Sequence, residues 1–263
     1  MIGIGATLFK VPTAYGPAGF NPKSLFSNGE EGVWYDPSDL STMFQNSDGT
    51  TAVAVGDPVG YIADKSGNGN HATQATSSKR PTLRESGGLY YLEFSGAQGL
   101  TTSSIDFTAT DTMTSCLGLK KDNDDTASLI ESSNNVFGSG NNGVFRLLST
   151  TAGLYRHQSK GTILSNADGT VAAPATSVLL GQSKISTDFN ILRIDGTQVG
   201  SGTTNQGDGN FTSQPLNVGA RNNASNLFLT GRIYSLIVRN ALSSSAEIDS
   251  TEAYVASKTG VSL

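Results

Sequence analysis

The chain has 263 residues, with 17 Lys and Arg against 22 Asp and Glu, and so a formal net charge of −5. Its 31 Gly and a charged fraction of only 15% favour short strands joined by turns over helices. An acidic chain without basic clusters lacks the surface that tracks phosphates, so nucleic acid is not an expected partner. The single Cys116 excludes an internal disulfide framework and a Cys-rich zinc site, and we expect it to be a small buried thiol.

The chain starts with MIGIGATLFKVP, which lacks the charged region and long apolar run of a signal peptide. No stretch approaches the roughly 18 to 20 apolar residues of a membrane helix. The sequence therefore predicts a protein that is made in the cytoplasm and does not insert into a membrane.

Residues 1–31 are predicted to form an irregular arm. They contain scattered apolar residues with three Pro and many Gly, but no sustained period, so the arm buries little by itself. Either the chain's own domain or a neighbouring subunit must hold it. The candidate docking side chains are Leu8, Phe9, Tyr15, Phe20, Leu25 and Phe26.

Residues 32–263 are predicted to form one all-β domain, an antiparallel two-sheet jelly-roll sandwich. Short aromatic or β-branched runs such as VWYD, LYYLEF, GVFRLLS and FNILRID alternate with Gly, Asn and Asp. About a dozen such runs without intervening helices favour two packed sheets. Asp195-Gly196 predicts a hairpin turn, because this dipeptide tolerates the positive φ angles of a type I′ turn.

The C-terminal stretch predicts one short helix. Ser244 is followed three residues later by Glu247, the spacing of a capping box. Ile248, Thr251 and Val255 then fall on one helical face, and Gly260 marks the end.

Two segments resemble bacteriophage structural proteins that contain a laminin-G-like or concanavalin-A-like jelly roll. One is GVWYDPSDL through DKSGNGNHATQ to RPTL, and the other is GRIYSLIVRNALSSSAEIDSTEAYVASKTGV. The resemblance covers residues 24–263 at both ends, with a poorly matched middle. It implies a non-enzymatic virion protein on the tail, baseplate, fibre or capsid surface, anchored to other virion proteins by the arm. A symmetric homo-oligomer, such as a trimer, is expected with it.

The stretch DKSGNGNHATQ is predicted to be a structural turn. Asp64 could offer an oxygen to Ca²⁺, but a calcium site usually needs several carboxylates, whereas Asn-Gly pairs suit tight turns. His71 has no second His or Cys nearby to share a metal. Asp122, Asp124 and Asp125 form the best acidic cluster, for which a solvated turn and a weak Ca²⁺ site both stay open. No other cofactor is expected.

An enzymatic alternative rests on Glu247, Asp249 and Glu252, an E-x-D-x-x-E pattern similar to that of laminarinase-type glycoside hydrolases. Retaining hydrolysis needs two carboxylates roughly 5 to 5.5 Å apart. On a helix these three positions diverge around the axis, so we predict no catalytic site and no enzyme. GSGNNG matches a dinucleotide fingerprint but precedes a strand, which predicts a hairpin loop.

The remaining alternative is a module that recognises a host-surface glycan. Tyr90, Tyr91, Tyr155 and Tyr234 lie in predicted strands, and adjacent Tyr90 and Tyr91 must face opposite sides of their sheet. An outward tyrosine could contact a sugar, although a half-buried tyrosine explains the pattern equally well.

Overall fold

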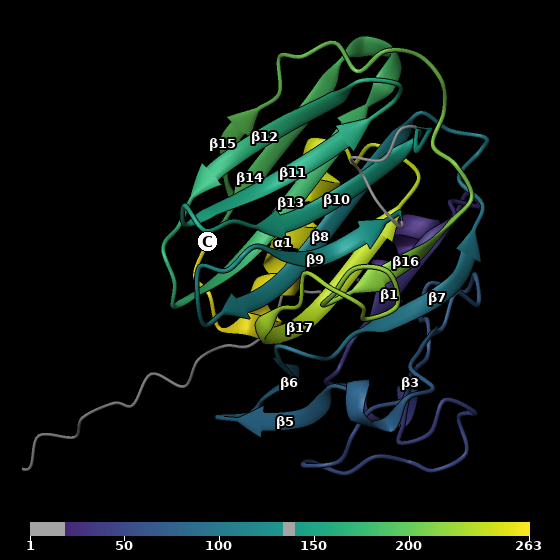
Figure 1. The fold of residues 1–263 in the computed structure, drawn as a ribbon, viewed down its shortest axis with the longest axis vertical. Helices are drawn as coiled ribbons and strands as arrows, with labels where there is room; N and C mark the ends of the chain where they lie inside the picture. Colours follow the sequence, from purple (N-terminus) through teal and green to yellow (C-terminus); the bar gives the residue numbers. More distant parts are fainter. Residues whose placement is uncertain (1–18, 134–139) are drawn as a thin grey trace, which may run out of the picture.

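The structure, a computed structural model, describes residues 19–133 and 140–263. Two antiparallel sheets pack face to face, and one C-terminal helix covers the outer face of one sheet (Figure 1). This confirms the predicted β-sandwich with one short helix. Residues 1–18, most of the predicted arm, lie outside the described residues. Within the described ranges no helix is long and apolar enough to cross a membrane.

The first sheet has eight strands. They are β1 (Gly32–Tyr35), β5 (Thr82–Ser86), β6 (Leu89–Ser95), β8 (Thr112–Lys121), β13 (Ala175–Lys184), β14 (Phe189–Ile194), β15 (Thr197–Ser201) and β17 (Thr230–Arg239). Their spatial order is β15-β14-β13-β8-β17-β6-β5, and β1 pairs with β17 beside this path. Strands distant in sequence are neighbours, as expected for a jelly roll.

The second sheet has nine strands. They are β2 (Met43–Phe44), β3 (Tyr61–Ile62), β4 (Ala72–Thr73), β7 (Leu100–Ile105), β9 (Ala127–Ser132), β10 (Val144–Ser149), β11 (Leu154–Lys160), β12 (Leu164–Thr170) and β16 (Gln214–Val218). Their spatial order is β12-β11-β10-β9-β16-β7-β4-β3-β2. Short 3₁₀ helices connect some strands: η1 (Pro22–Phe26), η2 (Leu40–Thr42), η3 (Ser77–Lys79) and η4 (Ile185–Thr187).

Two apolar layers hold these parts together. The larger lies between the sheets and includes Leu117, Phe145 and Leu236, all fully buried. The smaller lies between the eight-stranded sheet and helix α1 (Ser245–Thr259), with Cys116 and Val255 at its centre. Burial raises the pKa of Cys116 well above its usual range, so its thiol stays protonated, as predicted for a small buried side chain.

Local sequence signals set both the helix start and one hairpin as predicted. The Ser244 hydroxyl accepts from the Glu247 amide, and the Glu247 side chain accepts from the Ser244 amide, which completes the capping box. Asp195 and Gly196 have φ angles of 48° and 79° between β14 and β15, as a type I′ turn requires.

Candidate functional site

The DKSGNGNHATQ segment forms a closed turn. The Asp64 carboxylate accepts from the amides of Trp34, Ser66 and Asn70 and from the Ser66 hydroxyl, at 2.7–3.1 Å. The imidazole of His71 accepts from the Asp64 amide at 3.0 Å. Because four donors already surround the Asp64 carboxylate, it ties the turn to β1, and the segment is explained as structure.

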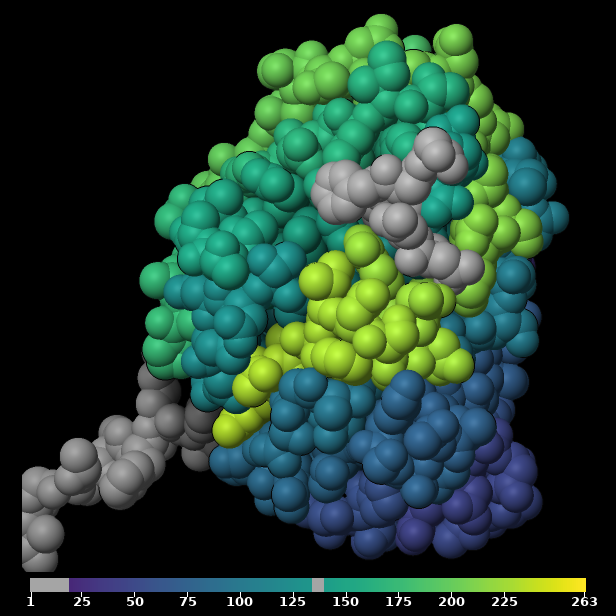
Figure 2. All heavy atoms as spheres, viewed as in Figure 1, coloured from purple at the N-terminus to yellow at the C-terminus, as the bar shows by residue number. Residues whose placement is uncertain are grey.

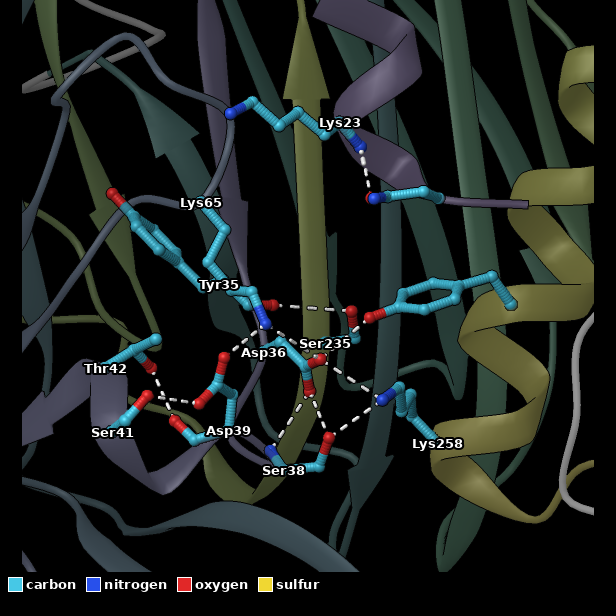
Figure 3. Close-up of polar contacts among 12 residues, drawn as sticks. Lys23, Tyr35, Asp36, Ser38, Asp39, Ser41, Thr42, Lys65, Ser235 and Lys258 are labelled. Carbon is cyan, nitrogen blue, oxygen red and sulfur yellow. Dashed lines mark hydrogen bonds and ion pairs between the residues drawn. The ribbon is translucent and has the colours of Figure 1, made fainter. Parts of the chain in front are cut away.

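Beside this turn, Asp36 joins the start of the domain to its last helix (Figure 3). Its carboxylate accepts from Ser38, from the Tyr254 hydroxyl at 2.8 Å and from the Lys258 ammonium at 3.1 Å, and Lys65 lies 3.6 Å away. Burial acts to raise the pKa of Asp36, but Lys258 and these hydrogen bonds outweigh it and hold the pKa below its usual value. The cluster is therefore an internal clamp between β1 and α1.

The acidic rim cluster does not converge on one point. Asp122 pairs with Lys120, Asp124 pairs with Lys121 and accepts from the Ala173 amide, and Asp125 accepts from Asn123. Across residues 19–133 and 140–263, no group of three or more His, Cys, Asp or Glu could hold a metal ion.

The three carboxylates of the E-x-D-x-x-E pattern lie on α1 and serve different purposes. Glu247 caps the helix and pairs with Arg239 at 3.0 Å, Asp249 is exposed, and Glu252 is buried in an ion pair with Arg193. Asp249, Glu252 and Arg193 do line a surface hollow of about 300 Å³ together with Asp195. Glu252 is held there by two hydrogen bonds from Arg193, each 2.9 Å.

The described part of the predicted arm packs on its own domain. Leu25 and Phe26 are buried and Phe20 is partly buried, all in the apolar layer beneath α1. Leu8, Phe9 and Tyr15 lie outside the described residues, so docking through them stays a prediction.

The tyrosines offered as sugar contacts are largely buried. Tyr91, Tyr155 and Tyr234 are 5%, 0% and 4% exposed, and Tyr90 is partly buried against the core. Tyr91 and Tyr234 stack on one another, with ring centroids 5.3 Å apart. These rings therefore work in packing, and an exposed sugar platform cannot be built from them.

A row of polar side chains crosses the outer face of the nine-stranded sheet. Its members are neighbours in register on five strands: Asn217 on β16, Glu131 on β9, Arg146 on β10, Gln158 on β11 and Asn166 on β12. Their chain neighbours Ile130, Leu147 and Ala167 belong to the core between the sheets, so the row points to the opposite face. Figure 1 shows this face toward the viewer, with α1 behind the sheets, and Figure 2 shows the same side of the molecule as spheres.

Hydrogen bonds connect the row from strand to strand. Glu131 accepts from Arg221 at 2.9 and 3.0 Å and lies 3.5 Å from the Arg146 guanidinium. Arg146 donates to the side-chain oxygen Oε1 of Gln158, and the side-chain nitrogen Nε2 of Gln158 donates to Oδ1 of Asn166 at 2.7 Å. The side chain that ends the row, Asn166, is exposed, whereas Glu131, Arg146 and Gln158 are at most 1% exposed.

A second polar pair lies beside this row on the same two strands. Arg156 on β11 donates to Asp168 on β12 through two bonds of 2.6 and 2.7 Å. The hydrogen bond to Asp168 raises the pKa of Arg156, and both side chains are about one third exposed. Arg156, Asn166 and Asp168, together named the polar patch, are accessible polar groups at the end of this network, which bonds to Asn166.

The row contains a buried ion pair between Arg146 and Glu131, and burial shifts the ionisation of the arginine. Burial lowers the pKa of Arg146 to about 10, although nearby Glu131 acts in the opposite direction. A buried ion pair often stabilises a fold less than apolar residues of the same volume, so retaining one on an outer sheet face is a reason to look for a function. The sequence reasoning missed this row. Its signal was an Arg inside the apolar run VFRLLS and a Glu inside ASLIES.

No family model matches the chain, and no curated protein matches its sequence. Solved structures do show its fold. An arabinofuranosidase complexed with arabinofuranosyl-α-1,2-xylobiose is similar at 17% identity and a TM-score of 0.63, over 91% of this chain and 65% of that one. Domain 4 of AbnA, an arabinanase from Geobacillus stearothermophilus in complex with arabinotriose, is similar at 12% identity and a TM-score of 0.58. The match covers 85% of this chain and 98% of that domain. A Trypanosoma rangeli sialidase is similar at 10% identity and a TM-score of 0.53, over 87% of this chain and 32% of that one.

These structures correct the leading prediction from the sequence. They are an arabinofuranosidase, an arabinanase domain and a sialidase, which goes against the prediction of a non-enzymatic virion structural protein. The chain spans less than two thirds of the arabinofuranosidase and about a third of the sialidase. The bacteriophage resemblance and the virion partners, oligomer and localisation that it implies stay untested predictions.

Proposed function

We propose that the chain is a carbohydrate-binding module that holds a glycan against the polar patch, without cleaving it. The observation that carries this proposal is the Arg156–Asp168 pair beside Asn166, whose side chain is held by the buried row. The fold similarity to carbohydrate-active proteins and to a domain bound to arabinotriose agrees with it.

The chemistry of the patch suits vicinal hydroxyl groups, each of which is both a donor and an acceptor. Arg156 uses Nε and Nη2 for Asp168, which leaves its Nη1 edge for a sugar oxygen. Asp168 keeps lone pairs for a hydroxyl proton, and Asn166 keeps its amide protons because only its Oδ1 is used by Gln158. The patch spans two strands and three residues along β12, about 5 by 7 Å, comparable with one sugar ring.

Existing hydrogen bonds order the patch before a ligand arrives: the buried row holds Asn166, and Arg156 and Asp168 hold each other. Gln158 fixes the orientation of the Asn166 amide, and Arg146 fixes that of Gln158. Polar groups that are already ordered lose little conformational entropy on binding, which favours affinity.

The direct test is a glycan array, followed by calorimetric titration of the strongest ligand. Arabinotriose and the arabinofuranosyl xylobiose belong in the panel because similar structures contain them. We expect Arg156→Ala to weaken binding at least about 10-fold, equivalent to about 1.4 kcal/mol. Arg84→Ala is the matched control, because Arg84 makes an exposed ion pair with Glu93 on another part of the surface. Equal loss in both variants, or none in Arg156→Ala, would contradict the proposed site.

Binding without cleavage is tested on the same ligands. We expect no new reducing ends after prolonged incubation of any oligosaccharide that binds. Release of reducing ends that survives purification to homogeneity and is lost in Asp168→Asn or Glu252→Gln would contradict the proposal and favour hydrolysis.

A further inference from the structure

His157 lies on β11 between Arg156 and Gln158 and faces the opposite side of the sheet. It is fully buried between the two sheets. Its Nδ1 lies 2.8 Å from the Asn190 side-chain oxygen on β14, and Asn190 in turn donates to Ser165 on β12. The imidazole therefore joins the strand pair of the polar patch to the opposite sheet.

The imidazole is tightly enclosed between the two sheets. A Cβ at Gly181 on β13 would lie 2.6 Å from the ring, so only glycine leaves room for it there. Within the described residues, the His157 Nε2 is buried without a hydrogen-bond partner, as are the hydroxyls of Ser159 and Ser183. A charged imidazole in this layer would be removed from bulk water, which disfavours the charged form.

Charged groups on the surrounding strands point away from the imidazole. On β10, β11, β12, β13 and β14 they occupy the outer faces of the two sheets, and they are Arg146, Arg156, Lys160, Asp168, Lys184 and Arg193. Tyr155 shares the inner face with His157, and the Lys121 ammonium lies over the Tyr155 ring. No carboxylate on these five strands faces the ring and could stabilise an imidazolium.

We infer that His157 makes the polar patch acid-sensitive: protonation of its buried imidazole favours separation of β11 and β12 from the opposite sheet and thereby releases a bound glycan. The release of glycan rests on the proposed function, whereas the opening of the strands does not. Opening exposes Nε2 to water, and because Arg156 and Gln158 flank His157, the binding groups move with it.

Linkage gives the direction and size of the effect. Burial, only partly opposed by hydrogen bonds to Asn190 and to the Ile191 backbone, lowers the pKa of His157 from 6.5 to about 4. The open state has the ordinary pKa and binds more protons, so falling pH favours opening from about pH 6.5 down to about pH 4. The equilibrium constant for opening should rise about 20-fold from pH 7 to pH 5 and about 100-fold from pH 7 to pH 4.

Hydrogen exchange of the β11 and β12 amides measures this opening, after correction for the intrinsic pH dependence of exchange. The chain offers a matched control because it has only two histidines. We expect the predicted loss of protection in the wild type and in His71→Gln, and a markedly smaller loss in His157→Gln, which keeps a hydrogen-bonding side chain that cannot charge. Saturating glycan should restore protection at pH 5, because it binds only the closed form.

Two outcomes separate the inference from the proposed function. If no glycan binds at pH 7, the proposed function fails, and the exchange data still decide whether His157 controls opening. If His157→Gln does not fold, imidazole NMR of the wild type decides instead. A His157 that stays neutral down to about pH 4 supports the inference, whereas one that titrates near pH 6.5 in the folded protein overturns it.

Discussion

The outer faces of the two sheets differ in chemistry. On the eight-stranded sheet, the cross-strand row Trp34, Ile237, Cys116 and Leu180 is apolar and lies beneath α1. On the nine-stranded sheet, the cross-strand row from Asn217 to Asn166 is polar, and its last member, Asn166 on β12, is exposed. One fold therefore presents a face sealed by its own helix and a face built of hydrogen-bonding groups.

The two faces serve different purposes: the apolar face stabilises the fold, and the polar face suits ligand binding. An apolar row needs a cover, and α1 supplies it, with the Arg193–Glu252 pair closing one edge. A buried polar row gives little net stability but holds planar side chains in fixed positions, which is what a binding surface requires.

The largest expected effect comes from the buried charge of Glu131 on β9, in the row that leads to the polar patch. Glu131→Gln removes the buried negative charge that pairs with Arg221 and lies beside Arg146, which should lower the free energy of unfolding by about 3 to 5 kcal/mol. Urea unfolding measures the loss. Glu93→Gln, which breaks the exposed pair with Arg84, should cost less than about 1 kcal/mol. Equal costs would show that the buried row adds no constraint.

On the other face, stability should come from packing. Leu180 is fully buried beneath α1, so Leu180→Ala should lower the free energy of unfolding by about 3 kcal/mol through lost contacts and a cavity. Leu242→Ala is the control, because Leu242 is 37% exposed and its change should stay within about 0.5 kcal/mol. Under conditions in which both variants remain folded, their affinity for glycan should be unchanged. Lost binding in Leu180→Ala would link the two faces.

The Asp36 clamp predicts a pH dependence of its own. The folded protein holds the pKa of Asp36 below the ordinary 3.8, so its contribution is present above about pH 4 and is lost as the pH falls through the folded value. Asp36→Asn should destabilise the protein by about 2 kcal/mol at pH 7, because a charged partner of Lys258 is lost. The difference from wild type should shrink toward pH 3 in urea titrations; a constant difference would contradict the assignment.

The smallest expected effect concerns the start of α1. Ser244→Ala removes the capping hydroxyl and should lower the free energy of unfolding by about 1 kcal/mol. Ser245→Ala, at the first helical residue, should change it by less than about 0.5 kcal/mol, since alanine is a good helix former. Thermal unfolding of both variants measures the pair, and a reversed order would contradict the capping box.

Features encoded by neighbouring residues could be predicted from the sequence. The capping box of Ser244 and Glu247 and the turn at Asp195-Gly196 depend on a few adjacent positions, and both are present. The turn at Asp64 was also expected, although its bond to Trp34, thirty residues away, was not.

The candidate site could not be predicted because its contacts are non-local. Glu131 meets Arg221 across 90 residues, and no local pattern sets that register. The tyrosines drew attention in the sequence because adjacent strand residues face opposite sides, but Tyr91 turned out to stack on Tyr234. The bacteriophage resemblance suggested a role that the structural comparison overturns.

The most direct test of the division between the two faces is NMR chemical-shift mapping with a bound glycan. The account predicts that shifts concentrate on β11 and β12, at Arg156, Asn166 and Asp168, and that Arg156→Ala abolishes them. Shifts that instead concentrate at the hollow beside α1, around Arg193 and Asp249, would contradict it.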